Sequence, residues 1–427
     1  MRRVRRAALA ALAGAAASAA IVPPFAGIPI PLLAAPRAAA DSALSGATGD
    51  VHPTPAARVL RPRAGPGPSF AIVAVDSAAS AWGVACAAPS IACGARIPAA
   101  AAGAGAVAVL GAPTGDVALA ALAALARGAG AAAAIDSARS LPGDPESWQI
   151  AAIGAGGAAA VSGKRLRGWA GAKSGKAYAC VGQGLDGGEP LQAMAAAFEA
   201  ASGDLSSRLL AALVAAAMAV DPDGAFEEAG GEASAALLVV RAGASSAAQG
   251  SDRLVDLRVD AADDPIPPLE RLHDRLEGSF LAAAHVRLGD RAKRLGDETG
   301  AAREYRAAEA GFRGALARAP KDSDALNELS WFLATHGGDP AEALRLAEAA
   351  VAARGDDANL YDTLAEAAYR SGNLERAIDA EQRAERLSRG NARYAERLRT
   401  FRAAKAALTK EAGPASPDSV AGAAPSR

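Results

Sequence analysis

A repeat of about 34 residues near the C-terminus constrains the fold more than any other feature of this chain. Residues 323–357 align with residues 357–391, and small residues recur at equivalent positions, namely Ala343 with Ala377 and Ala350 with Ala384. Such a repeat is typical of stacked helix pairs, which need alanine where two helices approach closely. Strand-like runs stop after about residue 275, where arginine and glutamate become more frequent. We therefore expect an all-α domain over residues 279–408.

An earlier copy of the repeat carries Leu295, Gly296, Ala308, Phe312, Ala315 and Pro320 at the expected offsets. The copies, which cover about residues 287–392, resemble the tetratricopeptide repeat. The resemblance implies a groove that binds an extended peptide or a helix of a protein partner. Asn359, Tyr361 and Tyr369 are the candidates for contacts with this unknown partner. The alternative is that the repeats only stabilise the preceding domain or form a homo-oligomer. The tail, residues 409–427, is expected to be disordered.

The region before the repeats alternates apolar, strand-like runs with alanine-rich helical stretches. Strands are expected at residues 70–76, 81–88, 105–112, 148–154, 158–163, 177–184, 233–242 and 253–260. Helices are expected at residues 116–129, 131–140, 189–202, 204–220 and 263–276. Groups of strands separated by helix pairs indicate a layered α+β sandwich over residues 69–278, with helices covering both sheet faces.

Residues 1–40 have the features of an export signal, and a Pro/Gly-rich linker follows over residues 41–68. The segment opens with MRRVRR, continues through a weakly apolar stretch and offers Ala38-Ala39-Ala40 as a cleavage site. Its prolines argue against a continuous spanning helix, although an uncleaved membrane anchor stays the alternative. Cleavage would change the net charge of −1 to about −6, which disfavours nucleic acid and anionic membranes as partners. We expect a periplasmic or secreted protein.

The three cysteines, Cys86, Cys93 and Cys180, show no spacing typical of a zinc site. In an exported protein Cys86 and Cys93, the closest pair in sequence, could form a disulfide. The other interpretation is that all three are buried small hydrophobic residues. No motif for a cofactor or a metal stands out along the chain, so we expect neither.

The sandwich region also resembles a known family. The segments that carry the resemblance are SFAIVAVD (69–76), VSGKRLRGWAGAKSGKAYACVGQG (161–184), LQAMAAAFEAASGDLSSRLLAAL (191–213), SAALLVV (234–240), DLRVD (256–260) and DPIPPLERL (264–272). Together they are similar to the secreted N-terminal-nucleophile-hydrolase-like proteins classified as domain of unknown function 1028. The resemblance spans about residues 68–278 and implies a four-layer αββα sandwich. The activity of that family is itself largely unassigned.

The resemblance places Ser69 at the position of a catalytic nucleophile. In hydrolases of this fold, the first residue of the mature domain attacks a carbonyl and its own α-amine is the base. An amide nitrogen cannot be this base, so activity requires a cut between Pro68 and Ser69. The scheme needs no histidine. The four histidines of the chain lie outside residues 69–260 and are His52, His273, His285 and His336. Their positions exclude a Ser–His–Asp triad or a histidine metal site within the sandwich.

Two further residues are candidates for the same pocket. Gln183 stands where the family usually has Asn and could donate a hydrogen bond to an oxyanion. Where the family tends to carry a Ser-Arg pair after its second strand, this chain has Pro89-Ser90. Where the family often has His and Gln, this chain has Ala172 and Glu232. These replacements leave two functions open. One is amide-bond hydrolysis through Ser69 after processing, by an amidase or a peptidase-like enzyme. The other is a catalytically degenerate sandwich that acts as a binding or assembly module through its repeats.

Four other residues are expected to have structural roles. Trp169 is expected in the core, and Asp76 is expected to end a strand at a turn. Lys164 and Lys173 are expected at solvated positions of hairpins rather than in the cleft.

Overall fold

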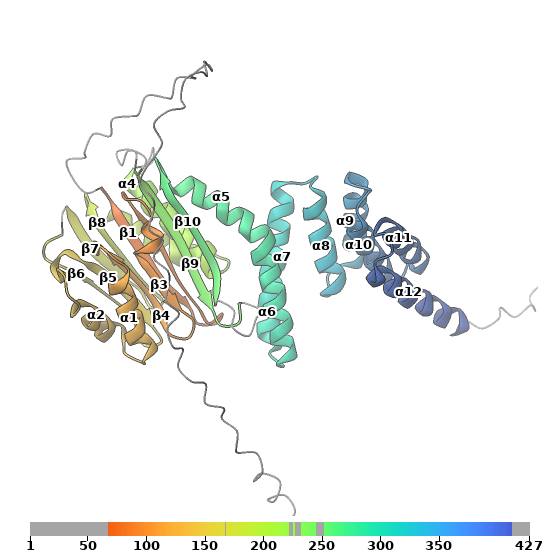
Figure 1. Cartoon of the computed structure of the whole chain (residues 1–427), viewed down its shortest axis with the longest axis horizontal. Coiled ribbons are helices and arrows are strands. Elements are labelled where there is room, and N and C mark those ends of the chain that lie inside the picture. The colour runs from red at the N-terminus through yellow and green to blue at the C-terminus, as the bar shows by residue number, and fades with distance from the viewer. Residues whose placement is uncertain (1–66, 167, 222–224, 227–231, 245–251, 412–427) are drawn as a thin grey trace, which may run out of the picture. The chain divides into compact units, whose positions relative to one another are not determined.

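The computed structural model describes residues 67–166, 168–221, 225–226, 232–244 and 252–411 (Figure 1). The expected export signal, most of the linker and the tail from residue 412 lie outside these residues. Among the helices that are described, none combines the length and the apolar composition needed to cross a membrane.

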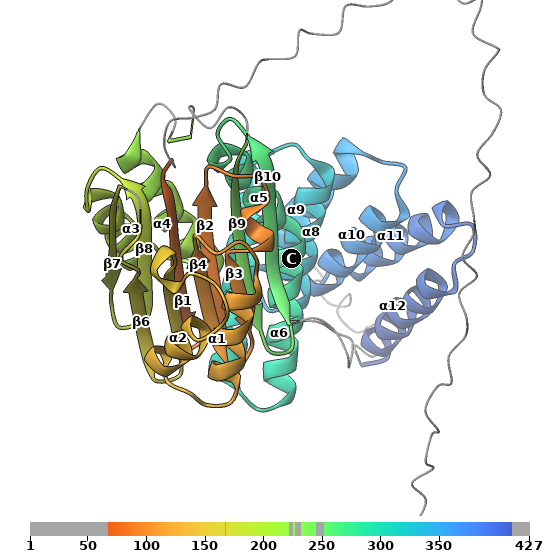
Figure 2. The ribbon, with the colours of Figure 1, turned by 60° about the vertical axis from the view of Figure 1, so that its left-hand side comes forward.

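Two antiparallel sheets form the centre of the N-terminal region (Figure 2). The first has the strand order β10-β9-β2-β1-β8-β7, with β1 Ser69–Asp76, β2 Ala81–Ala88, β7 Trp169–Ser174, β8 Tyr178–Leu185, β9 Ala233–Arg241 and β10 Arg253–Ala262. The second has the order β3-β4-β5-β6, with β3 Pro98–Ala101, β4 Gly105–Leu110, β5 Gln149–Gly154 and β6 Gly157–Ser162. The predicted mixture of strands and helices is thus confirmed.

Helices pack on the outer face of each sheet. Their bounds are α1 Asp116–Ala126, α2 Ala131–Arg139, α3 Glu189–Ala200, α4 Leu205–Val220 and α5 Ile266–Leu276. The pair α1 and α2 shares an apolar cluster with β4 and β5, whereas α3 and α4 share one with β1, β2, β8 and β9. A third cluster, with Val73 and Val84 among its members, fills the space between the two sheets. The layers therefore follow the order helices, sheet, sheet, helices.

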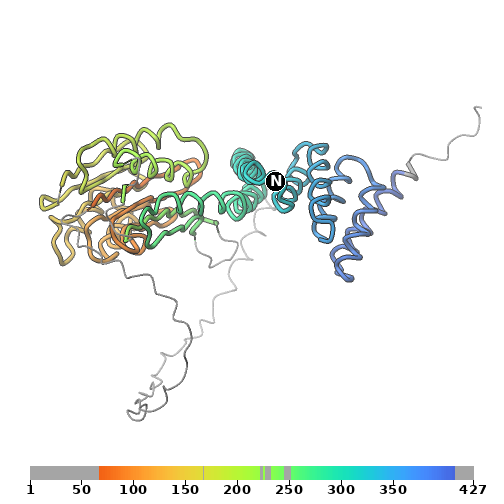
Figure 3. Tube along the Cα trace, turned by 90° about the horizontal axis from the view of Figure 1, so that it is seen from above, coloured from red at the N-terminus to blue at the C-terminus, as the bar shows by residue number. Residues whose placement is uncertain are grey.

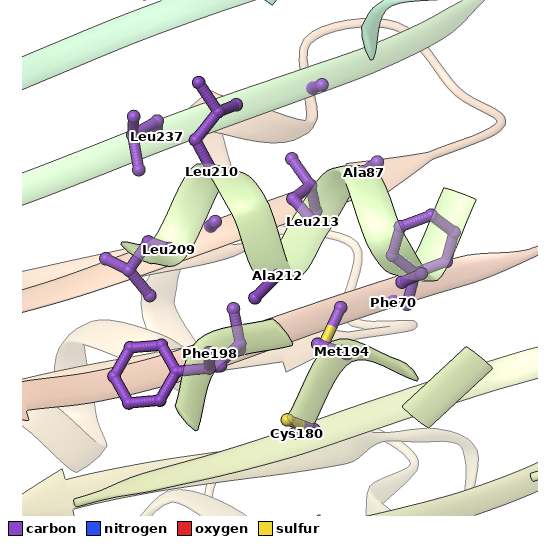
Figure 4. Packing of buried hydrophobic residues seen from close by; sticks show 14 of the residues in the cluster. Phe70, Ala87, Cys180, Met194, Phe198, Leu209, Leu210, Ala212, Leu213 and Leu237 are labelled. Carbon is purple, nitrogen blue, oxygen red and sulfur yellow. The ribbon is translucent and has the colours of Figure 1, made fainter. Parts of the chain in front are cut away.

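Small residues let these layers approach closely. Figure 4 shows Met194 and Phe198 of α3, with Leu209 and Leu213 of α4, packed above the strands. A Cβ at Gly83 of β2 would lie 2.5 Å from Leu209 Cδ1 and 2.9 Å from the Leu238 carbonyl oxygen. Position 83 therefore has no room for a side chain, and its glycine sets the distance between β2 and α4.

The C-terminal region consists of helices that follow one another along the chain (Figure 3). The π-helical segment η4, Glu277–Leu281, joins α5 to α6. The helices are α6 Ala282–Arg294, α7 Glu298–Arg318, α8 Ser323–Thr335, α9 Pro340–Ala353, α10 Ala358–Arg370, α11 Leu374–Leu387 and α12 Ala392–Glu411. The second helices α9 and α11 begin 34 residues apart, at Pro340 and Leu374. The four repeat alanines are wholly buried, as the close approach of paired helices requires: Ala343, Ala350, Ala377 and Ala384.

Helix caps explain where these helices begin. The side chains of Asp322, Asp339, Asp357 and Asn373 each precede a helix and accept a hydrogen bond from one or two of its first backbone N–H groups. Such caps satisfy donors that lack a partner inside the helix. The helix pairs are therefore encoded both by periodic alanines and by local start signals.

The structure departs from the sequence expectations at two strands. Strand β3 reads PAAA and strand β7 reads WAGAKS, and neither contains the run of β-branched residues that usually marks a strand. The expected core position of Trp169 is wrong, because the residue lies on the edge strand β7 and its side chain is 38% exposed. Its ring covers Gly171, where a Cβ would lie 2.3 Å from Trp169 Cη2.

Candidate functional site

Ser69 and Gln183, which the sequence proposes as nucleophile and oxyanion donor, lie side by side. They are directly opposed residues of the antiparallel strands β1 and β8. Directly opposed side chains lie on the same sheet face, with Cβ atoms about 5 Å apart. Since Ala71 and Val181, two positions further along, belong to the layer between the sheets, Ser69 and Gln183 face that layer. The two candidates thus occupy one end of the space between the sheets.

Gln149, which the sequence analysis did not single out, lies at the same end of the space between the sheets. It begins β5, is wholly buried and donates through Nε2 to Ser162 Oγ at 2.8 Å and to the Gly171 carbonyl oxygen at 2.9 Å. Its neighbour in the sheet is Leu110, and a Cβ at the next residue, Gly111, would lie 3.5 Å from Gln183 Nε2. Only the pairing of distant strands reveals this proximity.

The amide oxygens of Gln149 and Gln183 are buried and accept no hydrogen bond within the part of the chain that the structure describes. Buried acceptors of this kind are normally satisfied, so a donor from a water or a bound molecule would be stabilised at these oxygens. The end of the sandwich at Ser69 is therefore polar, although no histidine contributes to it.

The backbone before Ser69 is part of the fold. Gly67 and Pro68 are buried, and the Ser69 nitrogen is in a peptide bond with Pro68. In this form of the chain the nitrogen cannot act as a base. A cut before Ser69 would also remove two buried residues.

Ser90, the second pocket candidate, has partners in a turn that follows β2. Its hydroxyl accepts a hydrogen bond from Arg96 Nη2 at 3.1 Å, and its carbonyl oxygen accepts one from Ser234 Oγ. These contacts hold the turn against β9. Asp76, at the other end of β1, accepts a hydrogen bond from the Ala79 backbone N–H at 3.0 Å, which is the turn role that the sequence predicted. Lys164 and Lys173 are exposed, as expected.

A buried ionic cluster lies at the end of the sandwich opposite to Ser69. His285 of α6 contacts Glu304 of α7 through Nδ1 at 2.9 Å and Asp204, the N-cap of α4, through Nε2 at 3.4 Å. Arg241 of β9 makes two hydrogen bonds to the Glu304 carboxylate, at 2.7 and 3.0 Å. Arg303 adds a contact to Glu304 at 3.0 Å. The cluster ties the first helix pair of the repeat region to the sandwich.

The pKa values of His285, Glu304 and Asp204 indicate that all three groups are ionised at neutral pH. Burial lowers the pKa of His285, but its hydrogen bonds to Asp204 and Glu304 outweigh burial and raise the pKa to about 9. Burial raises the pKa of Glu304, but the hydrogen bonds from His285 and Arg241 lower it to about 2. The pKa of Asp204 is likewise held well below its usual range by His285 and the Ser207 N–H, against the effect of burial. The imidazolium is therefore paired with two carboxylates.

A cavity of about 300 Å³ lies beside this cluster, lined by residues that include Asp76, Val239, Leu281, Arg306 and Ala310. Since β1 advances about 3.3 Å per residue, Asp76 lies about 23 Å from Ser69. This cavity is therefore separate from the predicted nucleophile.

No histidine lies within residues 69–260, but one histidine from α5 reaches this region. Helices α5 and α6 pack back on the sandwich, so that His273 Nε2 lies 2.8 Å from Ser206 Oγ in α4. The Ser206 hydroxyl donates to Asp204 Oδ1 at 2.8 Å, and its side chain is wholly buried. Ser206 therefore has a structural hydrogen bond rather than the exposure that a nucleophile requires.

One grouping of possible metal ligands occurs among the described residues, namely His273, Asp274 and Glu277, whose ligand atoms lie within 4.8 Å of one another. Because Ser206 already engages His273 Nε2, only Nδ1 remains for an ion. The cluster lies on one helical segment and offers no closed coordination shell.

The partner-binding candidates lie on α10. Asn359 is exposed in its first turn, whereas Tyr361 and Tyr369 are half-buried. The Tyr369 ring packs on Phe401 of α12, with ring centroids 5.1 Å apart, and the guanidinium of Arg383 lies over Tyr361. Both tyrosines thus contribute to packing within the repeat region, and their role in binding stays a prediction.

A second concave surface lies between the α5–η4 junction and the α7–α8 junction. We call it the Phe280 groove. It has a volume of about 540 Å³ and is lined by residues that include Asp274, Phe280, Arg318, Asp324 and Glu328. The Phe280 side chain is 78% exposed. Desolvation, followed by the charge of Asp324, raises the pKa of Glu328.

Residues 69–269 match the model of the family of unknown function DUF1028. A crystal structure of a DUF1028 protein from Silicibacter pomeroyi is similar with a TM-score of 0.45 and 29% identity, over 51% of this chain and 90% of that chain. No curated protein matches this chain.

Other structures that are similar to this chain include domains of tetratricopeptide repeats. The Sgt2 repeat domain from Aspergillus fumigatus is 20% identical with a TM-score of 0.25, over 32% of this chain and 90% of that chain. The first such domain of human RPAP3 is 18% identical with a TM-score of 0.25, over 31% of this chain and 97% of that chain. The chain thus combines a segment that matches DUF1028 with helix pairs that resemble tetratricopeptide repeats.

Proposed function

We propose that this protein is an interaction protein, which binds a segment of a protein partner in the Phe280 groove. The observation that carries the proposal is the exposure of Phe280 at an open groove within the helical region. A large aromatic side chain that is 78% exposed loses much water-accessible apolar surface when a partner covers it. Aromatic residues are common anchors at the centres of protein interfaces.

Charge indicates the chemistry of the partner segment. The groove is lined by the four acidic residues Asp274, Asp322, Asp324 and Glu328, and by the two basic residues Arg275 and Arg318. Arg318 is already engaged by the Asp274 carbonyl oxygen at 2.7 Å and by Glu277 at 3.7 Å. Asp324 is in turn paired with Arg354 at 2.6 Å, so the acidic charge around the apolar anchor comes from Asp274, Asp322 and Glu328. A segment with an apolar side chain flanked by lysine or arginine is complementary to it.

A peptide-display selection with the intact protein tests this function. We expect enrichment of sequences with an apolar residue flanked by basic residues. Phe280→Asp and Glu328→Lys should each reduce binding of the selected peptides at least about tenfold, because they remove the anchor and reverse a charge. Leu295→Asp is the matched control, since Leu295 is 75% exposed but does not line the groove. Peptides that bind both groove variants as tightly as the native protein would refute the proposal.

Amide-bond hydrolysis through Ser69 is a second candidate, favoured by Gln183, which lies directly opposite Ser69 and whose buried amide oxygen accepts no hydrogen bond from the described residues. The scheme requires a chain that begins at Ser69. Such a chain can be produced by cleaving a fusion directly before this residue and then assayed with amide and peptide substrates. Turnover that disappears in Ser69→Ala would support hydrolysis. A folded chain that begins at Ser69 and has no such activity would contradict it.

We also propose that the protein is exported. The basic start, the weakly apolar stretch and the small-residue site of residues 1–40 support it. Fractionation of native cells tests it, and recovery of the protein in the cytoplasm with the leader attached would contradict it.

A further inference from the structure

We propose that Cys86 and Cys93 are a redox-active pair, and that a disulfide between them fastens the turn after β2. Their Sγ atoms lie 3.9 Å apart, in contact as a thiol pair. Both side chains are wholly buried in the layer between the sheets. All three cysteines of the chain are free thiols in the structure. Cys180 belongs to the layer on the opposite face of the six-stranded sheet and is the natural internal control.

One cysteine is fixed and the other sits on a short turn. Cys86 is in the middle of β2, where it pairs with Ala71 of β1 and Ala236 of β9. Cys93 begins a single turn of 3-10 helix, Cys93–Ala95, after Ala92 in a left-handed conformation with φ 53°. A disulfide brings its sulfurs to about 2.0 Å, so the two atoms must approach by about 2 Å. The short turn can supply this movement while the strand stays in place.

The local hydrogen bonds hold Cys93 close to Cys86. The Cys93 backbone N–H donates to Ser234 Oγ at 2.8 Å, and the Ala92 N–H donates to the Asp260 carbonyl oxygen at 2.8 Å. This preorganisation favours an intramolecular bond over a mixed disulfide with a small thiol.

The electrostatics of the pair distinguish its two members. The hydrogen bond from Cys86 lowers the pKa of Cys93 by more than burial raises it. The pKa of Cys86 is raised well above its usual range by the same hydrogen bond and by burial. The thiolate is the reactive form, so Cys93 is the attacking member of the pair. Because its sulfur is wholly buried in the folded chain, the attack takes place when local opening of the short turn exposes it.

The chemistry is thiol–disulfide exchange with a disulfide reagent RSSR, such as oxidised glutathione. The Cys93 thiolate attacks one sulfur of RSSR, breaks its S–S bond and releases RS⁻. Cys86 then loses its proton and attacks the Cys93 sulfur, which releases the second RS⁻. The two protein thiols lose two electrons in total, RSSR is reduced to two RSH, and the two protons end on the released thiols.

The bond would stabilise the turn that carries Ser90. The residues between the two cysteines include Ser90, whose hydroxyl and carbonyl oxygen already bond Arg96 and Ser234. A disulfide closes a loop of these few residues and reduces the freedom of the unfolded chain. The redox state therefore controls the rigidity of this turn, which follows β2 at the same end of the sheet as Ser69.

Peptide mapping tests the bond without any substitution. Cleavage after arginine and lysine places Cys86 and Cys93 together in residues 64–96 and Cys180 apart in residues 177–208. After equilibration of the native chain with oxidised glutathione, and after refolding in it, residues 64–96 should be lighter by two hydrogen atoms and resist alkylation once the chain is denatured. Cys180 should remain alkylatable. Two alkyl groups on residues 64–96 under both conditions, or a bond that involves Cys180, would overturn the proposal.

Stability measurements provide a second readout. Oxidation should raise the Tm of the wild-type protein and of Cys180→Ala by about 5 °C, and dithiothreitol should reverse the shift. Cys93→Ala should show no redox-dependent shift. An equal shift in Cys93→Ala would contradict the assignment, because that variant cannot form the bond.

Discussion

His285 Nδ1 lies 2.9 Å from Glu304 Oε2, and this buried pair joins α6 and α7 to each other beneath the end of the sandwich. The same imidazole faces Asp204 of α4, and Arg241 of β9 holds the other side of Glu304. The first helix pair of the repeat region is therefore fastened to the sandwich by charges that have little contact with solvent. Such pairs are sensitive to the removal of either partner.

The first prediction concerns pH. The pKa of His285 is about 9 in the fold, against an ordinary value of 6.5, and the neighbouring charges are Asp204, Glu304, Arg241 and Arg303. A raised pKa means that protonation stabilises the fold, so this contribution is complete below pH 6.5 and is lost as the pH rises through 9. We expect the free energy of unfolding to fall by about 3 kcal/mol over that interval. Urea unfolding measures it.

His285→Gln is the control for this effect. The variant should be less stable at pH 6 and should lack most of the decline between pH 6.5 and 9. A decline of equal size in the variant would show that other groups cause it.

The second prediction concerns close packing. Gly83→Ala should destabilise the fold by about 2 kcal/mol, because its Cβ would overlap Leu209 Cδ1 and the Leu238 carbonyl oxygen. Gly156→Ala is the matched control, since no atom lies within 4 Å of a Cβ at that position. The midpoint of urea unfolding distinguishes them. Equal midpoints for the two variants would contradict the packing of α4 on β2.

The third prediction concerns α12. Glu381 of α11 is wholly buried, and burial followed by the charge of Asp362 raises its pKa to about 8. Arg397 of α12 bonds Glu366 at 2.8 Å and lies 3.9 Å from Glu381. A carboxyl group with a raised pKa favours the fold when protonated, so its contribution decreases as the pH rises from about 4.5 to about 8.

Glu381→Gln mimics the protonated carboxyl and should raise the free energy of unfolding at pH 8 by about 2 kcal/mol, with little effect at pH 4.5. The exposed Glu375→Gln should change it by less than about 1 kcal/mol at either pH. Thermal unfolding at the two pH values checks both. A Glu381→Gln variant that is destabilised at pH 8 would refute the interpretation.

The sequence predicts elements well where the pattern is strong and local. The periodic alanines locate α8 to α11, and the apolar runs locate β1, β2 and β9. It fails at β3 and β7, because alanine and glycine carry little preference for strands and only pairing with neighbouring strands defines these segments. The expected core position of Trp169 is wrong because its exposure depends on the place of β7 at the edge of the sheet, and strand order is not encoded locally.

The candidate site, like the fold, could be predicted from the sequence only in part. The resemblance that selected Ser69 and Gln183 brought together two residues that the fold opposes across β1 and β8. Gln149 and the His285 cluster could not be found in this way, because their partners come from elements far apart in the chain and none belongs to a local motif. Their roles depend on burial and on distances that only the tertiary structure defines.

The identity of the N-terminal residue tests the central claim most directly, which is that the protein acts by binding while Ser69 stays in a peptide bond. Intact mass and terminal sequencing of the protein from its native compartment provide it. We predict a chain that begins before Gly67, so that the buried Gly67 and Pro68 are retained. A chain that begins at Ser69 would carry the free amine that hydrolysis requires and would contradict this account.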